Sequence, residues 1–137
     1  MRVPEILASQ KPNGQFGTEP WISTDQNVLL ALAAAWSLQD SSHHHSEQVL
    51  GAIARGGDAL IDAQDEKGMF VFRKKDHSTW GQSFHPWIYS RWVRAYEIAR
   101  DAMDDATRKR WDAALQKGYE GISTTAMKTR IFRRAMG

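Results

Sequence analysis

The 137-residue sequence contains no cysteine, which excludes a disulfide scaffold, a cysteine-ligated zinc site and a thiol nucleophile. It also lacks a long hydrophobic run, because the longest, over 28–36, has nine residues against the roughly 20 that a membrane helix needs. Met1-Arg2-Val3-Pro4 is not followed by the apolar core of a secretory signal. We therefore expect no membrane partner, and the compartment stays undetermined.

The sequence also has only a small excess of charge of one sign. Eighteen Lys and Arg residues oppose 16 Asp and Glu residues, which leaves a formal net charge of +2. That excess is too small to indicate a nucleic-acid partner. Hydrophobic residues are abundant: they make up 42% of the sequence, and six residues are Trp. This content is enough for the core of a single folded domain.

The first half of the chain predicts an irregular lead-in over 1–24, rich in proline and glycine, and then a helical hairpin over 25–63. Its first helix is predicted from about Asp25 to Leu38, with Ser23 and Gln26 as a capping box. Because 28–36 is apolar on every face, this helix should be enclosed by protein on all sides.

The second helix of this hairpin is predicted over about Glu47–Ala63, with Ser46 as its cap. Leu50, Ile53 and Leu60 share its apolar face. Gly56-Gly57 interrupts the middle of the helix, which indicates either a bend or a close contact with another helix.

The segment 64–84 is predicted to be an aromatic loop rather than a helix. Met69–Arg73 has the alternation of a short strand, with Phe70 and Phe72 on one face, and the chain then turns back toward Thr79-Trp80. Loops of this length are often functional.

A second helical hairpin is predicted over 85–122. Its first helix begins near Pro86, a residue suited to the first helical position. Its second helix runs from about Ala106 to Gly121, after a cap at Asp104 or Asp105. The basic tail over 123–137 is poorly patterned and is expected to be a frayed terminus. The predicted fold class is therefore all-α: antiparallel helical hairpins with a short β-hairpin-like loop.

Three local patterns together resemble the α/α-toroid carbohydrate-active enzymes, of the six-hairpin glycosidase and alginate or heparin lyase type. The first is the turn-rich Pro12-Asn13-Gly14-Gln15-Phe16-Gly17 ahead of the apolar helix, and the second is Asp65-Glu66-Lys67-Gly68-Met69-Phe70. The third is Trp87-Ile88-Tyr89-Ser90-Arg91-Trp92 running into Arg94-Ala95-Tyr96-Glu97-Ile98-Ala99. The resemblance spans about residues 12–122.

The resemblance implies a ring of alternating inner and outer helices, with the apolar helix as an inner one and a sugar-binding cleft in the long connections. Twelve such helices need roughly 200 residues, whereas four are predicted here. The ring would then be completed either by the remainder of a longer chain or by further copies of this one.

The loop after residue 64 also carries side chains suited to an acidic polysaccharide. Flat aromatic rings pack on the apolar faces of sugars, and arginine pairs with uronate carboxylates in bidentate fashion. The predicted substrate-binding residues are Trp80, Trp87, Arg73 and Arg91.

β-Elimination needs a base for the proton beside the carboxylate, an acid for the leaving oxygen and a cation on the acid group. His77 or His85 is predicted as the base and Tyr89 as the acid. Toroid lyases use Tyr and His in such roles, as the resemblance implies. The predicted function is therefore part of a polysaccharide lyase.

Other functions stay open. A glycoside hydrolase needs two facing carboxyls, but no pair stands out among Glu19, Asp25, Asp65, Glu66 and Asp76. A sugar epimerase of the same fold and a non-catalytic helical-hairpin interaction domain are further alternatives. His43-His44-His45 is expected to be a solvated loop, because three adjacent residues converge poorly on one ion. No metal and no cofactor are predicted.

Overall fold

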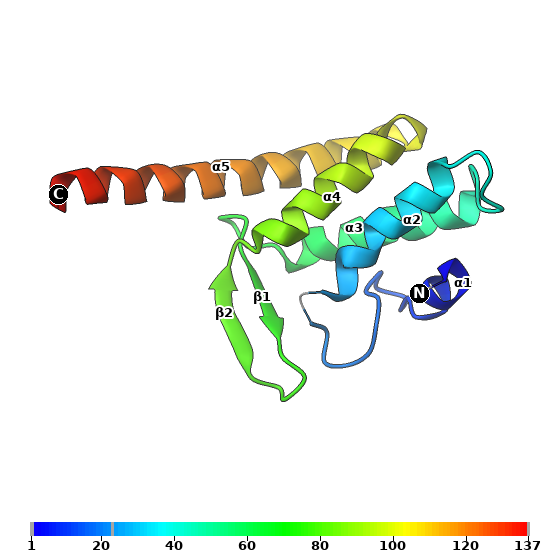
Figure 1. Ribbon diagram of the computed structural model, residues 1–137, viewed down its shortest axis with the longest axis horizontal. Coiled ribbons are helices and arrows are strands. Elements are labelled where there is room, and N and C mark those ends of the chain that lie inside the picture. Colours follow the sequence, from blue (N-terminus) through cyan, green and yellow to red (C-terminus); the bar gives the residue numbers. More distant parts are fainter. Residues whose placement is uncertain (1, 23, 137) are drawn as a thin grey trace.

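The computed structural model describes residues 2–22 and 24–136, with Trp80 and residues 125–136 described by their backbone alone. The described chain is mostly helical and carries a two-stranded antiparallel sheet. Figure 1 shows α2 and α4 side by side, α3 and α5 beside them, and the β-hairpin at the end where α4 begins. Among the described residues, no helix combines the length and the apolar character that crossing a bilayer requires.

The lead-in is not irregular throughout, so the prediction for 1–24 is wrong in part. Residues Val3–Ala8 form a short helix, α1, and its Ile6 is buried. Pro4 lies in the first turn of this helix and does not interrupt it. Backbone N–H groups in the first turn have no acceptor within the helix, so a proline there costs no hydrogen bond. The described remainder of the lead-in, 9–22 and 24, has turns and bends but no helix or strand before a 3₁₀ turn, η1, over Asp25–Asn27.

The helix α2, Val28–Ser37, follows η1 directly. It packs on α3 and most heavily on α4, and it buries Leu29, Leu32, Ala33 and Trp36. Its opposite side is open: Ala31 is exposed, and Leu30, Ala34 and Ala35 are half-buried. The described elements of this chain therefore leave part of α2 uncovered, and they do not by themselves complete the predicted enclosure.

The helix α3, Glu47–Ala63, confirms its predicted range, and Ser46 Oγ caps it by accepting the N–H of Val49 at 3.3 Å. The glycines in its middle are close-contact positions. A Cβ at Gly56 would meet Leu29 and Phe16, and a Cβ at Gly57 would overlap the ring of Trp111. The predicted close helix contact is thereby confirmed.

The β-hairpin joins β1, Phe70–Arg73, to β2, Thr79–Ser83. Phe70 and Phe72 face inward and are buried, as the alternation predicts, whereas Val71 and Arg73 are exposed. Phe72 meets Trp21 of the lead-in edge to face, with ring centroids 4.6 Å apart.

The helix α4, Pro86–Ala99, begins at the predicted proline, and a second 3₁₀ turn, η2, follows it over Arg100–Ala102. The helix α5 runs over Asp105–Met136, so the predicted end at Gly121 is wrong. Gly121 is a packing position, since a Cβ there would overlap the Phe84 ring and the Lys67 carbonyl oxygen. Gly118 likewise leaves room for the ring of Tyr89. The side chains of the basic tail from residue 125 onward lie outside the described part of the chain.

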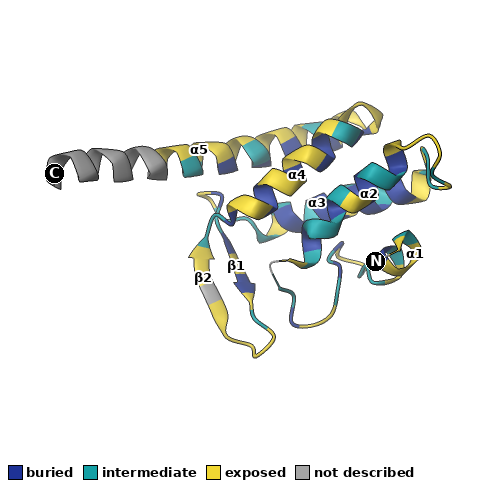
Figure 2. Ribbon diagram, viewed as in Figure 1, coloured by how far each residue is buried: buried dark blue, intermediate teal, exposed yellow. Residues whose placement is uncertain are grey.

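The buried side chains form one core between these elements. Figure 2 shows the buried segments of the helices turned toward one another, with exposed segments on α4 and around the β-hairpin. Trp92 and Trp111 lie at its centre with ring centroids 5.8 Å apart. The core therefore fixes α4 against α5 and leaves a surface groove beside them.

Candidate functional site

A groove with a volume of about 700 Å³ runs along α4 beside α5. Leu30 of α2, Val93 of α4, and Leu115 and Ile122 of α5 provide apolar lining. Tyr119, 68% exposed, adds an aromatic ring. The remaining lining residues are Tyr89, Ser90, Arg91 and Arg94 of α4. An apolar groove with a few polar groups has the usual composition of a ligand site.

The charge at this groove is positive. Arg91 and Arg94 are its charged lining residues, and both are exposed. Arg91 donates to the carbonyl oxygen of Trp87 at 3.2 Å, and among the described side chains it pairs with no carboxylate. Arg94 lies 3.9 Å from Glu97, an exposed contact that holds it weakly. Both guanidinium groups can therefore reach an anionic ligand.

Tyr89 lines the groove but is largely buried and already bonded. Its hydroxyl donates to the carbonyl oxygen of Gly68 and accepts from Gln64 Nε2 at 2.8 Å. Burial raises the pKa of this phenol, while the Gln64 bond opposes that rise. Through its hydrogen bond to Gly68, Tyr89 links α4 to the turn before β1.

His85 is buried to 1% exposure at the start of α4. Its ring packs among Phe72, Trp87 and Phe70 at centroid distances of 5.1, 5.3 and 6.3 Å. Neither ring nitrogen has a hydrogen-bond partner among the described residues. Burial lowers the pKa of the imidazole, so it is neutral at neutral pH.

The hairpin carries the other predicted residues. His77 lies in the exposed turn between the strands, with a positive φ of 70°, and Arg73 points outward from β1. The five-residue strand β2 alone places about 15 Å between the His77 turn and His85. The side chain of Trp80 lies outside the described part of the chain.

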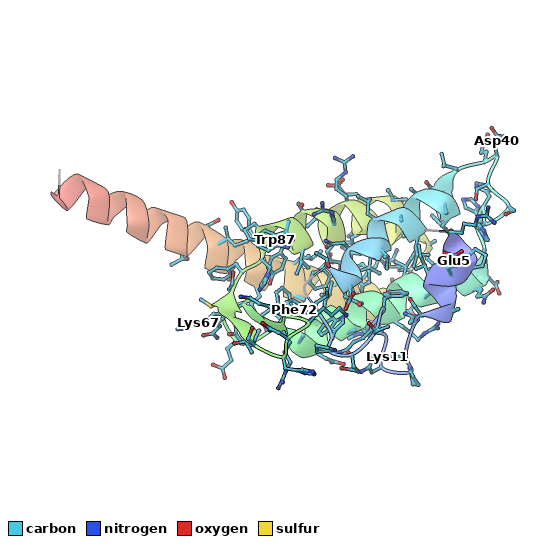
Figure 3. All side chains as sticks on the ribbon, turned by 60° about the horizontal axis from the view of Figure 1, so that its bottom comes forward. Glu5, Lys11, Asp40, Lys67, Phe72 and Trp87 are labelled. Carbon is cyan, nitrogen blue, oxygen red and sulfur yellow. The ribbon has the colours of Figure 1, made fainter. Side chains whose placement is uncertain are left out.

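The structure therefore brings some predicted residues together and separates others. Tyr89 and Arg91 line the groove, and Trp87, 48% exposed, lies one turn before Arg91. In Figure 3, Trp87 lies near the junction of the hairpin with α4. His77 and Arg73 are on the hairpin, and His85 lies beneath Trp87 with no open face. The groove along α4 is lined by Tyr89 but by neither His77 nor His85.

Sequence reasoning missed Arg94 and Tyr119. In the sequence, Arg94 stands out only as part of a segment that carries the resemblance, and Tyr119 falls within the predicted helix Ala106–Gly121 without a role. The spacing of Leu115, Tyr119 and Ile122 places them on one face of α5, which was the available signal. This spacing identifies groove residues only when the helix opposite that face of α5 is known.

Asp65 is already engaged by hydrogen bonds and is not free to serve as one of the two facing carboxyls that glycoside hydrolysis needs. Asp65 binds within its own turn, accepting the N–H groups of Lys67 and Met69 at 2.9 and 2.8 Å and the side chain of Gln82. Burial acts to raise the pKa of this carboxyl, but these hydrogen bonds outweigh it and the pKa is lowered. A lowered pKa suits an anchoring carboxylate rather than a general acid.

The histidine run after α2 does not assemble a metal site. The rings of His44 and His45 stack at 3.8 Å, and His45 also packs on Trp36 at 4.7 Å. Within the described ranges, no cluster of three His, Asp or Glu side chains could hold a metal ion. These histidines instead pack the loop against the end of α2.

Scans against protein-family models, curated proteins and solved structures found no significant match to this chain. Its function is therefore argued from the groove itself.

Proposed function

We propose that the groove along α4 binds acidic polysaccharide, and that the chain is part of a carbohydrate-active protein of the α/α-toroid type. The ligand class follows from the lining. Apolar and aromatic side chains accept the CH faces of sugar rings, and arginine accepts a uronate carboxylate. β-Elimination of such a polymer is the reaction that we propose for the whole protein.

The observation that carries this proposal is the position of Arg91. It lies on an apolar groove, is exposed, and pairs with no carboxylate among the described side chains. Arg94, a further lining residue on the same helix, gives a second cation for a repeating anionic chain. Neutral sugars would leave both charges unused.

The toroid architecture is supported by the open side of α2. A helix made almost wholly of Ala, Leu, Val and Trp exposes Ala31 and leaves Leu30, Ala34 and Ala35 half-buried. Such a surface is expected where a neighbouring helix would pack. In the proposed ring, that neighbour comes from further helical hairpins.

Within a lyase, this chain would supply substrate contacts first. Arg91 would neutralise the carboxylate and so acidify the adjacent C–H proton, which a base then removes as the glycosidic C–O bond breaks. Of the two predicted bases, His77 is exposed but lies in the hairpin turn outside the groove lining, and His85 is buried, so the proposed ring would have to supply or reposition the base. Tyr89 as the acid would first have to release its bond to Gly68.

The binding step is tested by calorimetric titration of the chain with an oligouronate and with a neutral oligosaccharide of equal length. We expect binding of the oligouronate alone, and a loss of about tenfold in affinity for Arg91→Gln, in line with one charge-assisted contact. Lys109→Gln removes the same charge from an exposed position of α5 and serves as the matched control.

Equal affinities for the acidic and neutral sugars, or equal losses in Arg91→Gln and Lys109→Gln, would contradict the proposal. Appearance of an ultraviolet-absorbing unsaturated uronate would test the lyase step separately. Binding of the oligouronate without that product would support the groove as a binding site and would show that this chain alone does not catalyse the elimination.

A non-catalytic interaction domain is the second candidate. The observation in its favour is that His85 and Tyr89 are both buried in packing and hydrogen-bond contacts. In that case the groove would bind no sugar, and the oligouronate titration would show no heat above dilution.

A further inference from the structure

We propose that His85 is an acid-sensitive latch that holds the β-hairpin on the start of α4. This inference goes beyond sugar binding and assigns the imidazole a conformational role. The side chain of His85 is titratable, is 1% exposed, and has two ring nitrogens without a partner among the described residues.

The ring of His85 stands between the two parts that it joins. Phe70 and Phe72 reach it from β1, and Trp87 reaches it from α4. Phe72 meets the imidazole at an interplanar angle of 90° and Trp87 at 79°. Neutral imidazole fills this aromatic cage without a net charge, with its N–H and its other ring nitrogen unpaired among the described residues.

The backbone also marks this residue. His85 has φ 47° and ψ 67°, in the left-handed region, and it caps α4 without a side-chain hydrogen bond. Its N–H donates to Ser83 Oγ at 3.3 Å, at the end of β2. The chain therefore changes from strand to helix at this residue, and the ring is held in the cage from both sides.

Among the side chains that the structure describes, none near His85 carries a charge that would compensate an imidazolium. The inner face of β1 presents phenylalanines, while Arg73 lies on its outer face; β2 presents Ser83; and α4 presents Trp87. Tyr89, one turn along α4, is bonded to Gln64 and Gly68. Burial alone lowers the pKa of His85, with no contribution from a carboxylate or a cation.

The direction of the pH effect follows from this lowered pKa. The released imidazole has its ordinary pKa of 6.5, so below that pH the undocked hairpin binds a proton that the docked hairpin excludes. Docking is fully stable above pH 6.5 and weakens as the pH falls toward the lowered value. The equilibrium constant for undocking should rise by about tenfold per pH unit in this window.

Hydrogen exchange of the hairpin amides measures this equilibrium. An isolated two-stranded hairpin is marginal in water, so its ladder over Phe70–Arg73 and Thr79–Ser83 should exchange once it undocks. After correction for the chemical exchange rate, we expect hairpin protection to fall as the pH drops from 6.5 toward the lowered pKa of His85, by at most about tenfold per pH unit. The amides of α3 should keep their protection.

The chain offers a matched control, because His77 also has a positive φ but is exposed in the hairpin turn. His77→Asn should keep the acid response. His85→Phe, which fills the cage without a titratable group, should abolish it. His85→Asn, a residue that tolerates positive φ, should abolish it as well and serves if the phenylalanine is strained there.

The latch is overturned if hairpin protection in the unmodified chain is independent of pH, or if both His85 variants keep its acid response. A parallel loss of protection in α3 would also overturn it, since the response would then be global unfolding.

Discussion

At the scale of single residues, Gln26 shows how one side chain organises the lead-in. Its Oε1 accepts the N–H of Phe16 at 2.8 Å and the indole N–H of Trp21 at 3.2 Å. Its Nε2 donates to the carbonyl oxygens of Gly14 and Gly56 at 3.2 and 2.8 Å. A buried amide with all of these bonds satisfied ties an irregular segment to α3.

Gln26→Leu should lower the free energy of unfolding by at least about 3 kcal/mol, because it leaves several buried donors and acceptors unpaired. Gln116→Leu is the control, since Gln116 is exposed and bonds only to the exposed Glu120. Denaturant unfolding of both variants measures the difference. A loss below about 1 kcal/mol in Gln26→Leu would mean that water replaces the amide.

At the scale of elements, the contact of α3 with α5 depends on a glycine. Gly57→Ala would push a methyl group into the indole of Trp111, and should cost about 1–3 kcal/mol by overpacking. Gly51→Ala lies in the same helix, where the new methyl meets only the end of the Arg55 side chain at 3.3 Å. It should stabilise the chain by about 0.5–1 kcal/mol.

Thermal unfolding of these two variants tests the contact. Opposite shifts of the melting temperature are expected from the same chemical change. If both variants were stabilised, α3 and α5 would not lie as close as the structure places them.

A second element-scale contact is the bond of Tyr89 to the turn before β1. Tyr89→Phe removes the hydroxyl between Gln64 and Gly68 and leaves the ring in place. We expect a loss of about 1–2 kcal/mol of unfolding free energy. Tyr119→Phe, altering an exposed phenol, should change it by less than about 0.5 kcal/mol, and equal losses would contradict the assigned role.

Elements were more predictable than the contacts between them. The cap at Ser46 and the alternation of Phe70 and Phe72 are local signals, and both elements form where predicted. Gln26 also bonds to Gly56, 30 residues away, which a local capping box does not predict, while Ser23, its partner in the predicted box, lies outside the described residues. Gly121 was misread as a helix end, because its role depends on Phe84.

The candidate site was less predictable for the same reason. Arg91 was identified from residue type, and the structure places it on the groove. Tyr119 could not be connected with it, because no local pattern states that this face of α5 lies beside α4. The burial of His85 likewise arises from a strand and a helix that meet only in the folded chain.

At the scale of the whole molecule, the open side of α2 is an apolar surface that the described elements do not cover. Together with Leu38, which is 60% exposed, it presents apolar side chains that the described elements leave uncovered. We expect the isolated chain to associate at high concentration. Ala31→Glu should weaken that association, measured by sedimentation, without lowering stability, since a carboxylate suits the first turn of a helix.

Association unchanged by Ala31→Glu would assign the contact to another face. Lys109→Gln is the control here too, because it alters charge at an exposed position on α5 rather than on α2.

The two glycine notches of α5 have a consequence for how this helix can move. A helix on an apolar partner can shift along its axis by one turn and find a similar surface again. Gly118 admits the ring of Tyr89, and Gly121 admits that of Phe84, so a one-turn shift of α5 would bring a residue with a Cβ against at least one of the two rings. The two glycines therefore oppose a one-turn slide of α5 against Tyr89 and Phe84.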